Sequence, residues 1–420
     1  MIVARSYYSL RYGVMSVEEL VRQAVACGME SLCMADINNT SGIIELMKYC
    51  READIRPIAG IEFHNGDDWL YTGIALNNHG YYQLNDFLSR YRLSRASLPR
   101  EAPVLKDVVF LYPYRRKPAG DLRENEFIGV RPHEVNRLVG NEYPRDADKL
   151  VALQPVTFLN QDDPEIHRHL RAIDHNALLS NVEDHWLASE NEFFEDPATL
   201  DAAYRPFPEL LENARSILDQ ASFFFEPGIK NKKTFTGNRQ EDRLLLERLA
   251  FEGMKARYGP DHPFAGERIS KELEIIDQLG FAAYFLITYD IIRYSMAQGF
   301  HHVGRGSGAN SVVAYCLYIT DVDPIELNLY FERFINPKRS SPPDFDIDYS
   351  WKERDRVLDY IFRTYPGEHT ALLGTISTFR GKSIVRELSK LYGLPKGETD
   401  AIIERPGQFI NRDATVDRIF

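Results

Sequence analysis

Six residues near the end of the chain, DFDIDY at 344–349, alternate strictly between acidic and apolar or aromatic side chains. On a β-strand, residues two apart point to the same side and lie about 6.6 Å apart, at about 3.3 Å per residue. The alternation therefore predicts a strand that carries Asp344, Asp346 and Asp348 on one face and turns its other face toward a core.

Three neighbouring carboxylates repel one another, and like charges side by side on a strand cost stability. Hard divalent cations, which prefer oxygen ligands, would offset this repulsion. Two metal ions about 3.5–4 Å apart, held by shared aspartates, are also a standard arrangement for in-line phosphoryl transfer. Taken alone, the motif is explained equally well by an acidic strand that faces solvent, so both interpretations stay open at this point.

A glycine-rich turn, GRGSGANS at 304–311, precedes this strand and leads into a helix expected over residues 310–318. Glycines let backbone N–H groups turn toward an anion, and a helix N-terminus adds its dipole. Arg305 adds a planar guanidinium suited to phosphate. Such a turn is most often only a turn. Next to an acidic strand, however, it predicts that Arg305, Gly306 and Ser307 hold a triphosphate while the aspartates hold metal.

Basic residues accompany both motifs. Arg333 precedes the acidic strand, and Lys382 and Arg386 fall four apart on a helix expected in KSIVRELSKLYG. Basic residues on a helix usually face solvent, but here we expect them to line a groove for DNA or a triphosphate. The predicted groove also includes Lys338, Arg339 and Arg380. The formal net charge of −12 argues against a stand-alone DNA-binding module and leaves room for a large enzyme with a local basic cleft.

The N-terminal half alternates between helical and strand patterns. Helices are expected over residues 17–30 and 43–55, and buried strands over 31–37 and 56–63. This order favours an α/β domain with a mostly parallel sheet. An acidic and then Gly-, Asn- and Lys-rich stretch within 184–240 indicates a connection, and helical patterns return from residue 241.

The cysteines and the N-terminus bear on location. The four cysteines form no CxxC pair and no zinc-type spacing, which predicts reduced, buried thiols. The N-terminus lacks the basic-then-apolar pattern of a signal peptide, and no apolar run reaches the ~18 residues of a membrane span. We therefore expect a cytoplasmic protein that does not enter a membrane.

Three blocks of this chain, in this order, resemble the palm domain of the C-family bacterial replicative DNA polymerases. They read GRGSGANSVVAYCLYITDVDPIELNLYFERFINP, PPDFDIDYSWKERD and TISTFRGKSIVRE. Upstream, YYSLRYG, MADINNTSG and RPIAGIEF resemble the family's polymerase-and-histidinol-phosphatase (PHP) domain. The resemblance covers nearly the whole chain.

The resemblance implies a fold and a domain order. It implies a PHP-like (β/α) barrel over 1–220, a linker over 221–240, a polymerase-β-like nucleotidyltransferase palm of α+β type over 241–390, and the start of a helical thumb over 391–420. It also implies template-directed DNA synthesis, in which a primer 3′-hydroxyl attacks the α-phosphorus of a deoxynucleoside triphosphate. The implied partners are primer–template DNA, deoxynucleoside triphosphates, and replisome subunits such as a sliding clamp and a proofreading subunit.

The resemblance also assigns roles to residues. Asp344 and Asp346 match the first two catalytic aspartates and would hold two Mg²⁺ ions, with Asp348 in support. Gly306 and Ser307 match the triphosphate-binding turn. The basic residues implied near the incoming nucleotide are Arg333 and Lys382, and we add Arg305 and Arg386 as substrate-binding residues.

Two departures from the family pattern matter. The family's third catalytic aspartate lies on a later palm strand beyond the thumb, whereas this chain ends at Phe420, so we expect it to be incomplete and inactive alone. The metal ligands of the PHP domain are also replaced. The replacements are Val3-Ala4-Arg5 for His-x-His, Tyr12 for an aspartate, Ile37 for a histidine beside the retained Asp36, and Pro155-Val156-Thr157 for a late Asp-x-His.

Of the PHP ligands, Glu62 alone is clearly retained. The replacements cannot coordinate a metal cluster, so we expect a PHP-like domain that keeps its fold, binds no metal and lacks catalysis. Two other functions stay open: a PHP-type metal-dependent phosphoesterase, which the lost histidines disfavour, and a non-catalytic scaffold derived from a polymerase.

Overall fold

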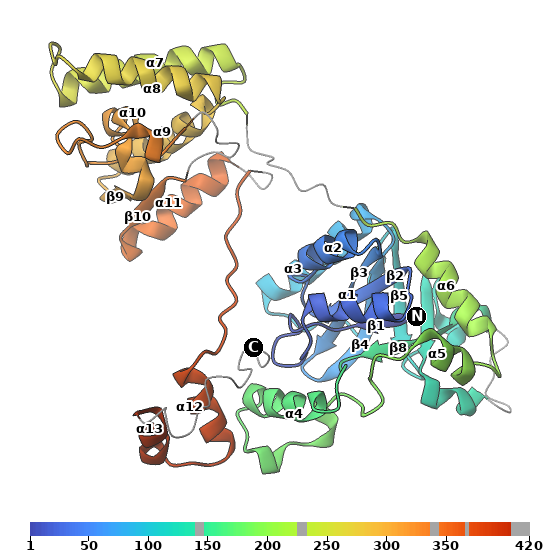
Figure 1. The fold of residues 1–420 in the computed structure, drawn as a ribbon. Helices are drawn as coiled ribbons and strands as arrows, with labels where there is room; N and C mark the ends of the chain where they lie inside the picture. Colours follow the sequence, from blue (N-terminus) through green and yellow to red (C-terminus); the bar gives the residue numbers. More distant parts are fainter. Residues whose placement is uncertain (139–146, 225–232, 337–343, 366–368, 405–420) are drawn as a thin grey trace. The chain divides into compact units, whose positions relative to one another are not determined.

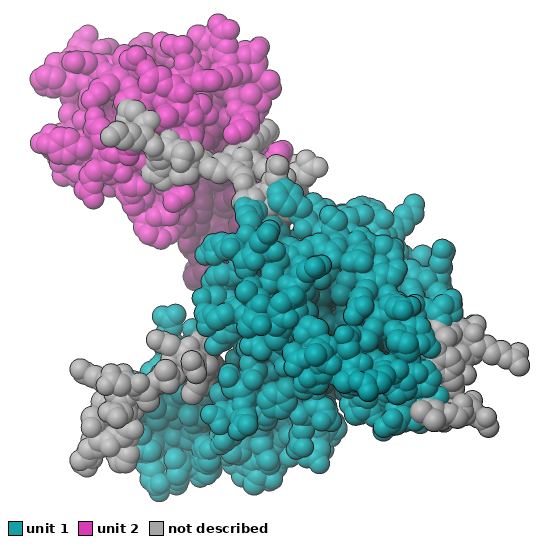
Figure 2. Space-filling model, turned by 45° about the vertical axis from the view of Figure 1, so that its right-hand side comes forward, with its two compact units in different colours: residues 1–226, 377–420 teal, residues 227–376 magenta. Residues whose placement is uncertain are grey.

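The computed structural model describes residues 1–138, 147–224, 233–336, 344–365 and 369–404. They fall into two compact units (Figure 2). The first unit comprises residues 1–226 and 377–420, and the second comprises residues 227–376.

The first unit is built on one eight-stranded sheet in the order β7-β6-β5-β4-β3-β2-β1-β8 (Figure 1). The strands are β1 (Ile2–Ala4), β2 (Ser31–Ile37), β3 (Arg56–Asn65), β4 (Asp68–Ala75), β5 (Val108–Pro113), β6 (Glu126–Val130), β7 (Leu150–Ala152) and β8 (Gln154–Val156). All neighbours run parallel except that β4 is antiparallel to both β3 and β5. The predicted α/β fold with a mostly parallel sheet is therefore confirmed.

The two edge strands of this sheet are joined by a single residue, Leu153. The Leu153 N–H donates to the Val130 carbonyl on one side, and the Gln154 N–H donates to the Met1 carbonyl on the other. Because both edges continue into one another, the sheet curls into a nearly closed barrel. The expected PHP-like barrel is present, with one reversed strand.

Helices cover this barrel. They are α1 (Val17–Ala26), α2 (Ile43–Glu52), α3 (Asn78–Ser94), α4 (Asp163–Asp174), α5 (Pro197–Ala203) and α6 (Glu209–Gln220), and the chain's last described helices, α12 (Lys382–Leu391) and α13 (Lys396–Glu404), belong to the same unit. Helix α1 begins at a capping box between Ser16 and Glu19 and buries Leu20, Val21 and Ala24. It ends before the predicted residue 30 because Gly28 adopts a positive φ of 66°.

The second unit combines helices with a two-stranded antiparallel sheet. Its elements are α7 (Arg239–Arg257), α8 (Ala265–Gln278), α9 (Ala282–Ala297), β9 (His302–Arg305), α10 (Val312–Cys316), β10 (Asp346–Tyr349) and α11 (Trp351–Thr364). Its core joins α7, α8, α9 and α10, and Phe331 and Phe334 pack against that core. Among the described residues, no single helix is long and apolar enough to span a membrane. Among them, only α8 and α9 taken together have the required length and composition, and these two helices are bent by 115° relative to one another.

Candidate active site

The acidic segment forms strand β10, as its alternation predicted. It pairs antiparallel with β9, placing Asp346 opposite Arg305 and Asp348 opposite Val303. Asp344, just before the strand, is exposed together with Asp346 and Asp348. The alternate residues, Phe345, Ile347 and Tyr349, are half-buried. Period-two geometry thus gathers three carboxylates on one open face of the second unit.

Arg305 partly neutralises this face. Its Nε donates to Asp348 Oδ2 at 2.7 Å, and its Nη1 lies 3.5 Å from Asp346 Oδ2. The hydrogen bond to Asp348 and the charges of both aspartates raise the pKa of Arg305. The sequence predicted Arg305 on a phosphate, whereas in the structure it faces the carboxylates, so its part in substrate binding stays a prediction.

The glycine-rich turn lies against the acidic strand. Gly306 has a φ of +74°, and a Cβ atom placed on it would lie 2.7 Å from Asp346 Oδ2. A Cβ on Gly308 would lie 2.7 Å from Cδ1 of Phe345. The turn is pinned internally, since the Asn310 Nδ2 donates to the Ser307 carbonyl at 2.8 Å. A side chain at position 306 would therefore displace the Asp346 carboxylate, and the positive φ there also favours glycine.

The helix after the turn differs from the prediction. Helix α10 spans only five residues, Val312–Cys316, instead of 310–318. Its first N–H groups, on Val312 and Val313, donate to the Glu272 carboxylate at 3.0 and 3.1 Å, and Ser311 Oγ donates to it at 2.8 Å. The N–H groups at this helix end are thus paired with a protein carboxylate, and the triphosphate role of Gly306 and Ser307 stays a prediction.

Glu272, on α8, was missed by the sequence analysis. Its residue is 1 % exposed, and burial raises the pKa of its carboxyl to about 7, although the N–H groups of Val313 and Val312 oppose that rise. Its place between Ile269 and Ile276 on the otherwise apolar face of α8 is the signal that the sequence carried. In the structure it ties α8 to the segment that follows the glycine-rich turn.

Glu272 predicts a pH dependence of the second unit's stability. Between its ordinary pKa of 4.5 and its folded value of about 7, the folded state keeps a proton that the unfolded state has lost. Stability should therefore fall as pH rises through this window, by about 3 kcal/mol. Glu272→Gln should flatten the fall in thermal unfolding measured at several pH values. The control is Glu274→Gln, at an exposed position on α8, which should leave the fall in stability with pH unchanged. If the unfolding temperature changed with pH equally in both variants, the prediction would be contradicted.

The other predicted basic residues are spread over both units. Arg333 is exposed at the end of a short 3-10 turn, Phe331–Arg333, in the second unit. Lys382 and Arg386 are exposed on α12, which belongs to the first unit. Lys338 and Arg339 lie outside the described residues. The common groove, and the palm boundary at residue 390, therefore stay predictions.

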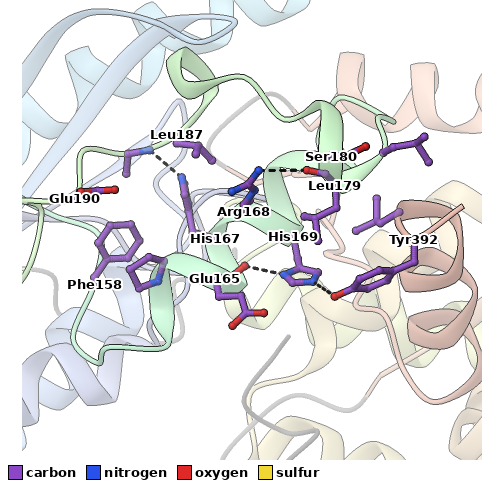
Figure 3. A pocket seen from close by; sticks show the side chains of 14 residues that line it. Phe158, Glu165, His167, Arg168, His169, Leu179, Ser180, Leu187, Glu190 and Tyr392 are labelled. Carbon is purple, nitrogen blue, oxygen red and sulfur yellow. Dashed lines mark hydrogen bonds between the residues drawn. The ribbon is translucent and has the colours of Figure 1, made fainter.

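Helix α12 packs on α4, where a cavity of about 740 Å³ opens (Figure 3). Leu391 forms a small apolar cluster with Ala172 and Ile173. The Tyr392 hydroxyl lies 2.8 Å from His169 Nε2, at one wall of the cavity. The lining is mainly apolar, and its histidines are engaged with protein partners, so this cavity contains no evident reactive group.

The barrel of the first unit holds a buried ion-pair network at the positions of the lost PHP ligands. Arg5, 1 % exposed, donates through Nε and Nη2 to both oxygens of Glu62 at 3.0 Å. Its Nη1 donates to Thr157 Oγ1 at 2.7 Å and to Glu192 Oε2 at 2.5 Å. Arg5 and Thr157, at two of the positions predicted to have lost their metal ligands, thus meet the retained Glu62 in one network.

Electrostatics keep this network charged. Burial disfavours the charge on Arg5, but Glu192 and Glu62 together raise its pKa above the ordinary value. Burial likewise opposes ionisation of the two glutamates, and Arg5 lowers the pKa of each. His64 Nε2 lies 2.6 Å from Glu62 Oε1 and completes the cluster.

The network does not suit a metal centre. The Arg5 cation sits between Glu62 and Glu192, so a divalent ion there would meet like charge. The retained Asp36 instead accepts hydrogen bonds from the Ser6 N–H, the Ser6 hydroxyl and the Ser9 hydroxyl. In the described part of the chain, no three His, Cys, Asp or Glu side chains converge in a metal-binding arrangement. The side chains of Asp344, Asp346 and Asp348 therefore do not form such an arrangement either.

Both units match known families. Residues 244–417 match the bacterial DNA polymerase III alpha NTPase domain, and residues 3–119 match the PHP domain. An error-prone DNA polymerase of Symbiobacterium thermophilum is 28% identical, over 95% of this chain and 41% of its own length. A DNA polymerase III subunit alpha of Escherichia coli K12 is 30% identical, over 94% and 38% respectively. The chain thus spans about two fifths of these relatives.

Solved structures give only a weak likeness. An amidohydrolase from Chromobacterium violaceum aligns with 48% of this chain and 95% of its own, at 12% identity and a TM-score of 0.21.

Proposed function

This chain belongs to the bacterial DNA polymerase III alpha family, and on that premise we propose that its second unit carries the metal- and nucleotide-binding part of a template-directed DNA polymerase. One observation supports the proposal most directly. The Asp346 carboxylate lies against Gly306 of the glycine-rich turn, on the same exposed face as Asp344. A phosphate-binding turn and metal-binding carboxylates must adjoin to act on one triphosphate.

The roles of the residues follow from their chemistry. Asp344 and Asp346 offer exposed carboxylate oxygens, which suit Mg²⁺, and bound Mg²⁺ would supply charge neutralisation at the phosphates. Gly306 and Ser307 would hold the triphosphate, with Arg305 and Arg333 as further substrate contacts in the same unit. The substrate contacts predicted for Lys382 and Arg386, which lie in the first unit, stay predictions. Asp348 would have a supporting role on this acidic face of β10, where it accepts a hydrogen bond from Arg305. Positioning of the primer hydroxyl at the α-phosphorus, with pyrophosphate leaving, would account for most of the rate.

The first unit has a structural part in this proposal. A PHP-type phosphoesterase is the weaker alternative, because Arg5 fills the centre where that activity needs metal. Primer–template DNA and deoxynucleoside triphosphates are the proposed partners, with a sliding clamp and a proofreading subunit in the assembled replisome. Because bacterial DNA is replicated in the cytoplasm, we propose that the protein acts there.

The proposal predicts nucleotide binding without synthesis. The 420-residue chain should bind Mn²⁺ together with dATP, because the turn and both aspartates are present, but should not extend a primer, since it spans only about two fifths of its relatives. Asp344→Asn and Asp346→Asn should each weaken Mn²⁺ binding at least about 10-fold. Mn²⁺ electron paramagnetic resonance with dATP and a primer-extension assay measure the two outcomes.

Asp359→Asn, an exposed aspartate on α11, is the matched control and should bind Mn²⁺ like the original chain. Mn²⁺ binding that is indifferent to Asp344 and Asp346 would refute the proposed site. Primer extension that both substitutions abolish would instead support the site and refute the inactivity of this chain by itself.

A further inference from the structure

The main chain between the two proposed catalytic aspartates is supported from outside the β9–β10 ladder. That ladder begins with the pair Asp346 and Arg305, so Phe345 lies just before it. The Phe345 N–H instead donates to the hydroxyl of Tyr284 at 2.8 Å. Tyr284 lies in the first turn of α9, far from the strand in sequence. A buried helix thus supplies the hydrogen bond that a neighbouring strand would otherwise provide.

Aromatic packing fixes the same residue. The Tyr284 and Phe345 rings stack, with centroids 5.2 Å apart and planes 13° apart. Phe285 meets Phe345 edge-on at 5.1 Å, and Phe334 lies 5.0 Å away. Gly308 of the glycine-rich turn also lies close to this ring, since a Cβ placed on it would be 2.7 Å from Phe345 Cδ1. Phe345 is therefore held between α9 and the turn, and its neighbours Asp344 and Asp346 must project to the opposite face.

We propose that Tyr284 is a positioning residue of the polymerase site, whose hydroxyl and ring hold Phe345 so that Asp344 and Asp346 are aimed together at the glycine-rich turn. This inference rests on the proposed function and deepens it. Tyr284 touches neither metal nor nucleotide in this role. It acts by fixing the backbone from which both carboxylates project, and small displacements of such groups weaken a metal site strongly.

Helix α9 also holds the far end of the strand, and this provides a matched control. The Tyr349 hydroxyl lies 2.9 Å from Ser295 Oγ on α9. Tyr284→Phe and Tyr349→Phe each remove one hydroxyl that links α9 to the acidic segment. Only the Tyr284 hydroxyl bonds to the main chain between Asp344 and Asp346. Comparing the two variants therefore separates an effect on the direction of the carboxylates from the general loss of a hydrogen bond.

The test measures Mn²⁺ affinity by electron paramagnetic resonance with dATP, and thermal unfolding, on the 420-residue chain. Both tyrosine variants should lower the unfolding temperature by similar, small amounts. Tyr284→Phe should weaken Mn²⁺ binding about 10-fold, because it leaves the Phe345 N–H without its partner. Tyr349→Phe should change it less than about 2-fold. In an Asp344→Asn background, Tyr284→Phe should add little, since the residue acts through the aspartates.

Each outcome decides the matter. Equal Mn²⁺ affinities in Tyr284→Phe and Tyr349→Phe, with aspartate-dependent binding intact in the original chain, would overturn the role of Tyr284 and leave the proposed function standing. Full additivity of Tyr284→Phe with Asp344→Asn would also overturn it. Binding in the original chain that ignores Asp344 and Asp346 would refute the proposed function, and the positioning role with it.

Discussion

Replacing Arg5 with methionine should destabilise the first unit by about 3–5 kcal/mol, the largest stability effect expected of any single change here. Methionine removes the cation that Glu62 and Glu192 share, so that Glu62 keeps His64 at 2.6 Å and Glu192 keeps Arg131 at 3.5 Å as basic neighbours. An uncompensated buried charge is far more costly than a lost exposed pair. At roughly 2–4 °C per kcal/mol for a unit of this size, calorimetry should show its unfolding temperature fall by about 10 °C.

An exposed ion pair gives the control for Arg5. Arg22 and Glu18 form an i,i+4 pair on α1 whose side chains are 68% and 54% exposed. Arg22→Met should cost less than about 1 kcal/mol. Adding Glu62→Gln and Glu192→Gln to Arg5→Met should recover part of the loss, because neutral amides need no counter-charge. Equal losses for Arg5→Met and Arg22→Met would show that the network does not hold the barrel together.

Gly306→Ala should nearly abolish metal–nucleotide binding in the second unit, weakening it about 100-fold. The new Cβ would lie 2.7 Å from Asp346 Oδ2, so the carboxylate must move, and alanine is also strained at a φ of +74°. A displacement of about 1 Å of a reactive group can cost about 10²-fold. The measurement is Mn²⁺ affinity in the presence of dATP.

Gly299→Ala separates the two causes. Gly299 has nearly the same φ, +71°, in the same unit, but a Cβ there would meet nothing within 4 Å. The two variants should therefore lose similar stability, while only Gly306→Ala should lose binding. If Gly299→Ala weakened Mn²⁺ binding as strongly, backbone strain alone would explain the result and the contact with Asp346 would be irrelevant.

Local patterns in the sequence predicted the local structures well. Strand β2 occupies the predicted 31–37, and the acidic segment exposes and buries alternate residues as its period requires. Helix ends were predicted less well, as at α1, where one glycine with a positive φ ended the helix early. The α10 helix was predicted too long because its sequence is uniformly apolar and gives no end signal.

The partners of buried charges could not be predicted in the same way. Arg5 directly follows an apolar strand, and Glu62 lies within another, so the sequence did signal that each needs a counter-charge. It did not indicate that Glu192, 187 positions from Arg5, would complete the network. The prediction recognised that Arg5 stands at the position of a metal ligand, but not that Arg5 pairs with Glu62 and Glu192.

The sequence by itself therefore determined the α/β class of the first unit, the acidic face of β10 and the glycine-rich turn, because residue period and chemical type are properties of short segments. Only the tertiary structure decided that Glu272 occupies the α10 end, that Arg305 faces the aspartates, and that Tyr284 holds Phe345. Each of these contacts joins segments about 40 to 60 positions apart. No local pattern constrains which distant group satisfies a buried donor or charge, so the packing of the whole unit makes that choice.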